Sequence, residues 1–103
     1  MPRAVTFHPE AEAEFLAAVT RYEGLQPGLG EAFGAAVRVA TEFAGEWPAA
    51  GGPHGATLRR VFVRRFPYFV LYAHDATQVY VVAVAHFRQR PGYWMERAPT
   101  GPA

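Results

Sequence analysis

The sequence predicts an α+β fold in the order strand, helix, helix and three strands, with the helical hairpin packed on one face of a small, mainly antiparallel sheet. Apolar residues recur at steps of three to four between positions 9 and 45, the spacing of buried helix faces. Beyond position 57 the period drops to two, as in strands. The 103 residues, 50% of them hydrophobic, suffice for one core and are too few for two domains, so residues 1–97 are expected to form a single domain.

The first elements are a short strand over residues 5–8 and a helix that begins at Pro9. Proline is tolerated at the first helical position, and the glutamates that follow it favour the positive end of the helix dipole. A buried stripe then repeats at helical spacing: Ala11, Phe15, Ala18, Val19 and Tyr22. Gly24 is expected to end this helix.

A turn over residues 25–28 leads into the second helix, which is predicted to run to about Gly45. Its apolar stripe consists of Leu29, Phe33, Ala36, Val37, Ala40 and Phe43. Two helices joined by so short a loop should form an antiparallel hairpin. Residues 46–55 contain two prolines and show no periodicity, which indicates a loop or crossover.

Three strands are predicted after this loop, over residues 58–65, 68–74 and 78–86, and they form a meander. In the last strand, small apolar side chains suit a position under the helices, whereas the alternate residues point to the other, partly open face. The first set is Val79, Val81, Ala83 and Ala85, and the second is Tyr80, Val82, Val84, His86 and Arg88. The tail, residues 98–103, is expected to be disordered.

Charge is distributed unevenly along the chain, although the net charge is only +1. Residues 1–50 carry three arginines and seven glutamates, a net of −4, whereas residues 51–103 carry seven arginines and two acids, a net of +5. The second half should therefore attract an acidic partner. The predicted binding residues combine charge with large rings: Arg59, Arg60, Arg64, Arg65, His86, Arg88, Arg90, Tyr93 and Trp94.

Composition also narrows the class of protein. Without cysteine the chain has neither disulfides nor thiolate metal sites, and its four histidines lack metal-ligand spacing, so no metal or cofactor is expected. No apolar run is long enough to span a membrane or to act as a signal peptide. The cytoplasm is the expected location.

Taken in order, these motifs resemble the ParE/RelE toxin superfamily of bacterial toxin–antitoxin pairs, which includes plasmid stabilisation proteins. The resemblance rests on Phe-His-Pro-Glu-Ala at 7–11, Arg-Phe-Pro-Tyr at 65–68, and Ala-Val-Ala-His-Phe-Arg-Gln-Arg-Pro-Gly-Tyr-Trp at 83–94, and it covers about residues 4–97. It implies a toxin held inactive in a hetero-oligomer by a small antitoxin, whose C-terminal segment wraps the toxin.

Members of this superfamily differ in their target, and two residues favour one branch. Ribosome-dependent ribonucleases of the family place cations where this chain has Phe62 and Phe69, and those cations stabilise the phosphate charge of the transition state. The resemblance therefore favours the ParE-like branch, whose members are similar to DNA gyrase poisons and do no bond chemistry. If the chain is instead a metal-independent endoribonuclease acting on ribosome-bound mRNA, the residues that carry catalysis are Arg60, His86, Arg88 and Tyr93.

Two further alternatives remain open on the sequence alone. A nucleic-acid-binding module would use the arginine-rich sheet without toxicity, and its affinity would fall steeply with salt because phosphate contacts release counterions. A decayed toxin would bind only its antitoxin.

Overall fold

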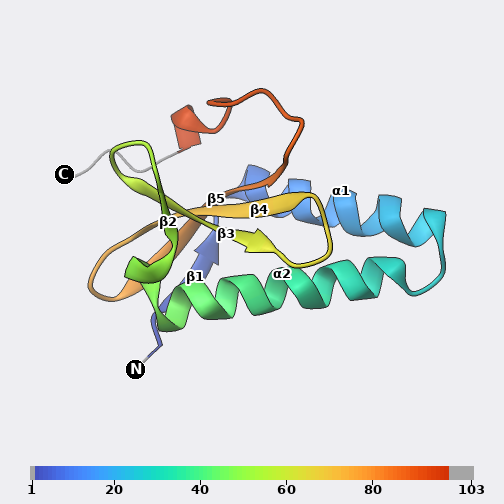
Figure 1. Cartoon of the computed structure of the whole chain (residues 1–103), viewed down its shortest axis with the longest axis horizontal. Coiled ribbons are helices and arrows are strands. Elements are labelled where there is room, and N and C mark those ends of the chain that lie inside the picture. Colours follow the sequence, from blue (N-terminus) through green and yellow to red (C-terminus); the bar gives the residue numbers. More distant parts are fainter. Residues whose placement is uncertain (1, 98–103) are drawn as a thin grey trace.

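Two helices cover one face of a five-stranded sheet in the computed structural model, which describes residues 2–97 (Figure 1). The elements are β1 (Ala4–Phe7), α1 (Pro9–Leu25), α2 (Leu29–Glu46), β2 (Gly52–His54), β3 (Leu58–Val63), β4 (Tyr68–His74) and β5 (Gln78–His86), with short 3-10 helices at Pro48–Ala50 and Met95–Arg97. The strand order is β1-β5-β4-β3-β2, in which β1 is parallel to β5 and the other neighbours are antiparallel. The predicted α+β class and element order are confirmed. The tail predicted over residues 98–103 lies outside the described residues.

Helix α1 begins as predicted and ends one residue later than predicted. The His8 ring nitrogen Nδ1 accepts a hydrogen bond from the Glu10 amide at 3.0 Å, so His8 caps the helix ahead of Pro9. Gly24 lies inside the helix, and the expectation that it ends α1 is wrong. The chain leaves the helix at Gln26, whose backbone is extended (φ −160°, ψ 127°), because the following Pro27 disfavours helical backbone at the residue before it.

The turn of the hairpin is fastened by one carboxylate. Glu23 accepts hydrogen bonds from the amides of Gly28 and Gly30, at 2.9 Å and 3.0 Å, and so satisfies donors at the start of α2. Gly28 adopts a left-handed backbone (φ 88°), which glycine tolerates without strain. The two helices therefore leave the turn antiparallel, as the short loop predicted.

The main core fills the space between the helices and the sheet. Its centre is Phe33 of α2, which is fully buried and meets the edges of the Phe66 and Tyr68 rings at 5.1 Å and 4.9 Å between centroids. The other members are Ala11, Ala18, Val37, Ala40, Ala44, Val63, Val70, Tyr72, Val79, Val81 and Val84. Edge-to-face contacts of this kind add to the free energy gained by burying the rings.

The region between α2 and β3 is more ordered than the sequence predicted. Residues 52–54 form strand β2, which pairs with β3, although this stretch was predicted to be loop. The strand is only three residues long and contains Pro53, so neither its length nor its composition gives a strand signal. Proline is tolerated there because β2 is an edge strand of the sheet.

Strand β3 is shorter than predicted. It ends at Val63, and Arg64 and Arg65 belong to the turn before β4. Arg65 has a positive φ of 75°, a conformation that no strand residue adopts. Alternation of charge and apolar residues therefore continued past the end of the strand and concealed the turn.

A β-bulge in β5 changes which side chains face the helices. Leu71 is paired with Ala83 and Tyr72 with Val81, so Val82 is an extra residue that has no partner on β4. An inserted residue reverses the alternation beyond it. Consequently Val84 packs in the main core, and Ala83 packs on the opposite face.

The bulge corrects the predicted faces of four residues of β5. Ala83 and Ala85 were expected under the helices and instead lie on the other face, while Val84 was expected on the open face and is in the main core. His86 also lies on the helix side, where its ring meets Tyr68 edge to face at 5.0 Å. The predictions for Val79, Val81, Tyr80 and Val82 are confirmed.

The face of the sheet away from the helices carries a second, smaller core. After β5 the chain turns back along this face, visible as the orange and red segment of Figure 1. Trp94 is only 4% exposed and packs over the strands. The buried residues beneath it are Leu58, Leu71, Val82, Ala83 and Ala85. The face predicted to be partly open is therefore sealed in its middle by the C-terminal segment.

Candidate functional site

Three phenylalanines form an exposed aromatic patch at one end of the face away from the helices. Phe62 and Phe69 are paired across β3 and β4, and Phe87 follows β5. The Phe87 ring lies 5.8 Å from Phe62 and 6.2 Å from Phe69. Phe62 and Phe87 remain 54% and 53% exposed, which is unusual for rings of this size in a folded domain. We call Phe62, Phe69 and Phe87 the aromatic patch.

Arg60 lies beside the aromatic patch and places its positive charge against the Phe62 ring. Its guanidinium carbon is 5.1 Å from the centre of the Phe62 ring, within the range of a cation–π contact. Its buried Nε has no hydrogen-bond partner within the described residues. The pKa of the neighbouring His54 is lowered, first by burial and then by the positive charge of Arg60.

The remaining predicted arginines divide between two locations. Arg59 points to the helix side and donates to the Gly51 carbonyl at 2.8 Å, which gives it a structural partner. The exposed Arg64 and Arg65 lie in the turn between β3 and β4, and the exposed Arg88 and Arg90 follow β5. The Phe87 amide donates to the Pro67 carbonyl at 2.9 Å, which holds that turn and that segment together. The structure therefore brings four exposed arginines to the end of the sheet that carries the aromatic patch.

Tyr93 and Trp94 belong to the second core. The Trp94 ring lies edge-on to Phe69 at 6.1 Å and to Tyr93 at 5.0 Å. Tyr93 is half-buried under the guanidinium of Arg97, which lies 4.9 Å from its ring centre. Burial, reinforced by the negative charge of Glu14, raises the pKa of Tyr93 well above its ordinary value. Packing therefore accounts for the position of both rings.

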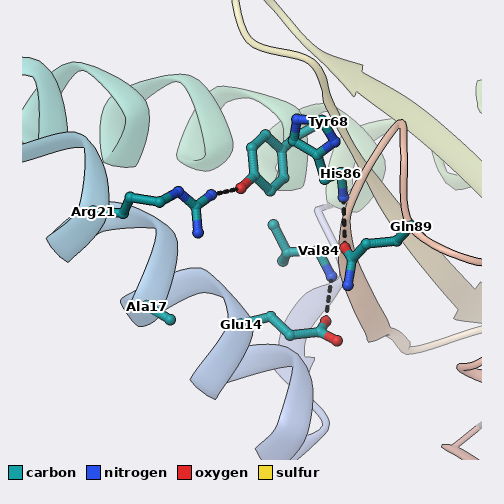
Figure 2. Close-up of a pocket in the computed structure, with 7 residues that line it drawn as sticks. All are labelled: Glu14, Ala17, Arg21, Tyr68, Val84, His86 and Gln89. Carbon is teal, nitrogen blue, oxygen red and sulfur yellow. Dashed lines mark hydrogen bonds between the residues drawn. The ribbon is translucent and has the colours of Figure 1, made fainter. Parts of the chain in front are cut away.

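A cleft of about 450 Å³ lies on the helix side, between α1 and the ends of β4 and β5 (Figure 2). It is lined by Glu14, Ala17, Arg21, Tyr68, Val84, His86 and Gln89. Arg21 reaches from α1 across the cleft and donates a hydrogen bond to the Tyr68 hydroxyl. Only His86 of these residues was predicted to be functional. Arg21 and Glu14 were missed because the charges of the first helix read as an ordinary solvated face, and nothing in the sequence places that helix beside β5. Gln89 follows β5 by three residues, but a single uncharged glutamine gives no functional signal.

Side chains cover the backbone of β5 along this cleft. Glu14 accepts from the Val84 amide at 3.1 Å, and Gln89 accepts from the His86 amide at 2.8 Å, both through Oε1. The Val82 carbonyl accepts from Arg97 Nη1 at 3.2 Å. Arg97 also pairs with Glu14 at 2.8 Å, so the two covering side chains hold each other in place.

The four residues predicted to act together in a ribonuclease are separated in the structure. Arg60 lies on the face with the aromatic patch, whereas His86 lies in the cleft on the helix side. Arg88 is exposed in the segment after β5, and Tyr93 is half-buried under Arg97. General acid–base catalysis needs the proton donor and the charge-stabilising group at one reacting centre.

No group of three or more histidine, aspartate or glutamate side chains in residues 2–97 is placed to hold a metal ion. No helix in the same range is long and apolar enough to cross a membrane.

Comparison with known proteins gives a similarity of fold. No protein-family model matches the sequence, and no curated protein matches it either. Among solved structures, the fold is similar to a chain of the chromosomal ParDE toxin–antitoxin system from P. aeruginosa, with a TM-score of 0.65. The similarity covers 82% of this chain and 95% of that chain at 15% sequence identity, which establishes a shared fold.

Proposed function

We propose that this chain is the toxin of a two-component toxin–antitoxin system, of the ParE type, and that it acts through protein–protein contact. The fold similarity to a ParDE chain supports the toxin class. The observation that carries the ParE-type assignment is the cross-strand pair of Phe62 and Phe69. Ribosome-dependent ribonucleases of the superfamily that this chain resembles place cations at these two positions. Two neutral rings cannot stabilise the negative charge that develops on the phosphate.

The surface proposed to bind the antitoxin is the aromatic patch with its surrounding arginines. Exposed rings act as anchors in protein interfaces, and a rim of positive charge selects an acidic partner. That charge is supplied by five arginines, Arg60, Arg64, Arg65, Arg88 and Arg90. Among residues 87–97, the only acidic residue is Glu96, which is exposed. A toxin–antitoxin hetero-oligomer in the cytoplasm follows from this proposal.

DNA gyrase is the proposed target, on the strength of the resemblance to the ParE-like branch. The proposal is tested by inducing the chain alone in bacteria and then together with the protein encoded beside it. Growth arrest that the neighbouring protein relieves, with inhibition of gyrase supercoiling by the purified chain, is the expected result. The matched variants are Phe62→Ser in the aromatic patch and Val39→Ser, an equally exposed apolar residue on α2.

Three outcomes would overturn the assignment. Cleavage of message in the ribosomal A site, abolished by Arg88→Ala, would establish the ribonuclease instead. Nucleic-acid binding that weakens steeply with salt, without growth arrest, would identify a binding module. Binding of the neighbouring protein without any growth arrest would identify a decayed toxin.

A further inference from the structure

We propose that the cleft between α1 and β5 receives an extended acidic segment of the partner protein, which pairs with the part of the β5 edge that has no neighbouring strand. The inference rests on the proposed function for the identity of the partner, which is the antitoxin. It concerns a surface separate from the aromatic patch. The evidence comes from the backbone of β5, the space beside it and the charge in that space.

The edge of β5 lacks a neighbouring strand over its second half. β1 pairs with β5 only from Gln78 to Val81, and the His8 amide makes the last backbone contact, to the Val81 carbonyl at 2.8 Å. From residue 82 onward the partners described above are side chains, those of Glu14, Gln89 and Arg97. Backbone groups spaced along a strand in this way are the template to which an added strand binds.

The other end strand at β2 is a poorer template. It has three residues and includes Pro53, which has no amide to donate. The stretch of β5 without a neighbouring strand on this side runs for five residues, Val82 to His86, and contains no proline. The cleft of about 450 Å³ lies directly against it, with Val84 and His86 in its wall (Figure 2). The β5 edge therefore has both the donors and the room for an extended segment.

Charge in the cleft specifies the kind of segment. Glu14 is neutralised by its 2.8 Å pair with Arg97. Arg21 forms no ion pair with any residue from 2 to 97, and its contact there is the uncharged hydroxyl of Tyr68. An uncompensated guanidinium facing the cleft favours a carboxylate, with which it can form two parallel hydrogen bonds. The partner segment is thus extended and carries an acidic side chain near its contact with Arg21.

Glu14 acts as a placeholder in this scheme. Its carboxylate accepts the hydrogen bond of the Val84 amide in the free protein. On binding, a backbone carbonyl of the incoming segment accepts that hydrogen bond instead. Glu14 then keeps its partner Arg97, so no buried charge is left unpaired. Exchange of one hydrogen bond for another makes the edge safe from self-association in the free protein while leaving it available to a partner.

The test uses two synthetic peptides about eight residues long, one alternating valine with glutamate and the other alternating valine with lysine. Isotope-labelled protein is titrated with each peptide, and amide exchange is followed residue by residue. The glutamate peptide is expected to slow exchange of the Val84 and His86 amides at least about tenfold. The Ala83 and Ala85 amides face β4 and should change little.

The variant Arg21→Glu is expected to invert the preference, weakening the glutamate peptide and strengthening the lysine peptide by about tenfold each. Arg21 is an exposed residue of α1, so this substitution is expected to preserve the fold. Arg38→Glu is the matched control, since Arg38 is exposed on α2 and does not line the cleft. Equal binding of both peptides, protection at β2 instead of β5, or the same effect from Arg38→Glu would overturn the inference.

A binding measurement with the protein encoded by the neighbouring reading frame distinguishes failure of this inference from failure of the proposed function. If it fails to bind, the toxin–antitoxin proposal fails and the peptide result stands by itself. If it binds without slowing exchange at Val84 and His86, the strand-docking inference fails and the toxin–antitoxin proposal survives.

Discussion

The helix-covered face of the sheet and the opposite face are sealed by very different amounts of structure. Helices of 17 and 18 residues cover the first, and their core is continuous from Ala11 to Val84. The opposite face is covered by one short segment, in which Trp94 is the only buried residue among those described after β5. Because this segment covers only part of the face, the aromatic patch remains exposed. One face is therefore closed by two helices, and the other retains exposed apolar area.

The largest effect is expected from the single ring that seals the second face. Trp94→Ala uncovers Leu58, Leu71 and Val82 and should lower the free energy of unfolding by about 3–5 kcal/mol. Denaturant unfolding measures the loss. Met95→Ala is the control, since the neighbouring side chain is 72% exposed. A loss below about 1 kcal/mol for Trp94→Ala would mean that the second core contributes nothing to the fold.

On the helix side, a smaller effect is expected from the removal of one hydroxyl. Tyr72 is fully buried, and its hydroxyl donates to the Pro48 carbonyl at 2.7 Å. Tyr72→Phe leaves that carbonyl without its partner and should cost about 1–3 kcal/mol. Tyr80→Phe, at a half-buried position on the other face, should change the unfolding free energy by less than about 0.5 kcal/mol. Equal losses would show that the two faces do not differ in this respect.

A substitution in the aromatic patch should weaken binding while leaving the free energy of unfolding nearly unchanged. Phe62→Ser removes an exposed ring and should change the free energy of unfolding by less than about 1 kcal/mol, while weakening antitoxin binding by at least about tenfold. Calorimetry of binding and thermal unfolding of the same samples measure the two quantities. A large loss of stability with unchanged affinity would assign the patch to the core.

The smallest effect concerns pH and arises at His54, which contacts Phe69 and Trp94 on the face away from the helices. Burial and the charge of Arg60 hold the folded-state pKa of His54 below its ordinary value near 6.5. Between the two values the unfolded chain binds more protons, so the free energy of unfolding falls as pH drops through about 6.5. His54→Gln should flatten this slope, and Arg60→Gln should reduce it. An unaltered slope in both variants would remove His54 as its source.

Elements governed by local periodicity were predictable from the sequence, and departures from periodicity were not. The helical stripes through Ala18 and Phe33 located both helices, and the turn after Leu25 fixed their antiparallel arrangement. A single extra residue at Val82 then reversed the predicted faces of Val84 and His86, because no sequence signal marks a bulge within an unbroken run of small apolar residues.

The candidate site was predictable only in part. Clustering of the arginines in the second half was visible from charge alone, but Arg59 turned inward to Gly51. Trp94 was predicted as a contact residue and is buried, since residues after a final strand carry no signal of the face to which they return. Arg21 and Glu14 are separated from β5 by more than fifty positions, so their cleft depends on tertiary packing that composition does not reveal.

The parallel pairing of β1 with β5 has a consequence for how the protein is made. Ala4 pairs with Gln78, which lies 74 residues later (78 − 4), and Arg97 must be present before it can hold Glu14. At a synthesis rate of about 5–20 residues per second, the first strand waits roughly 4–15 s for its neighbour. The arginine-rich strands and the segment that seals them are translated after both helices. A growing chain therefore lacks these contacts, and is inactive under the function proposed here, until residues 78–97 have been translated.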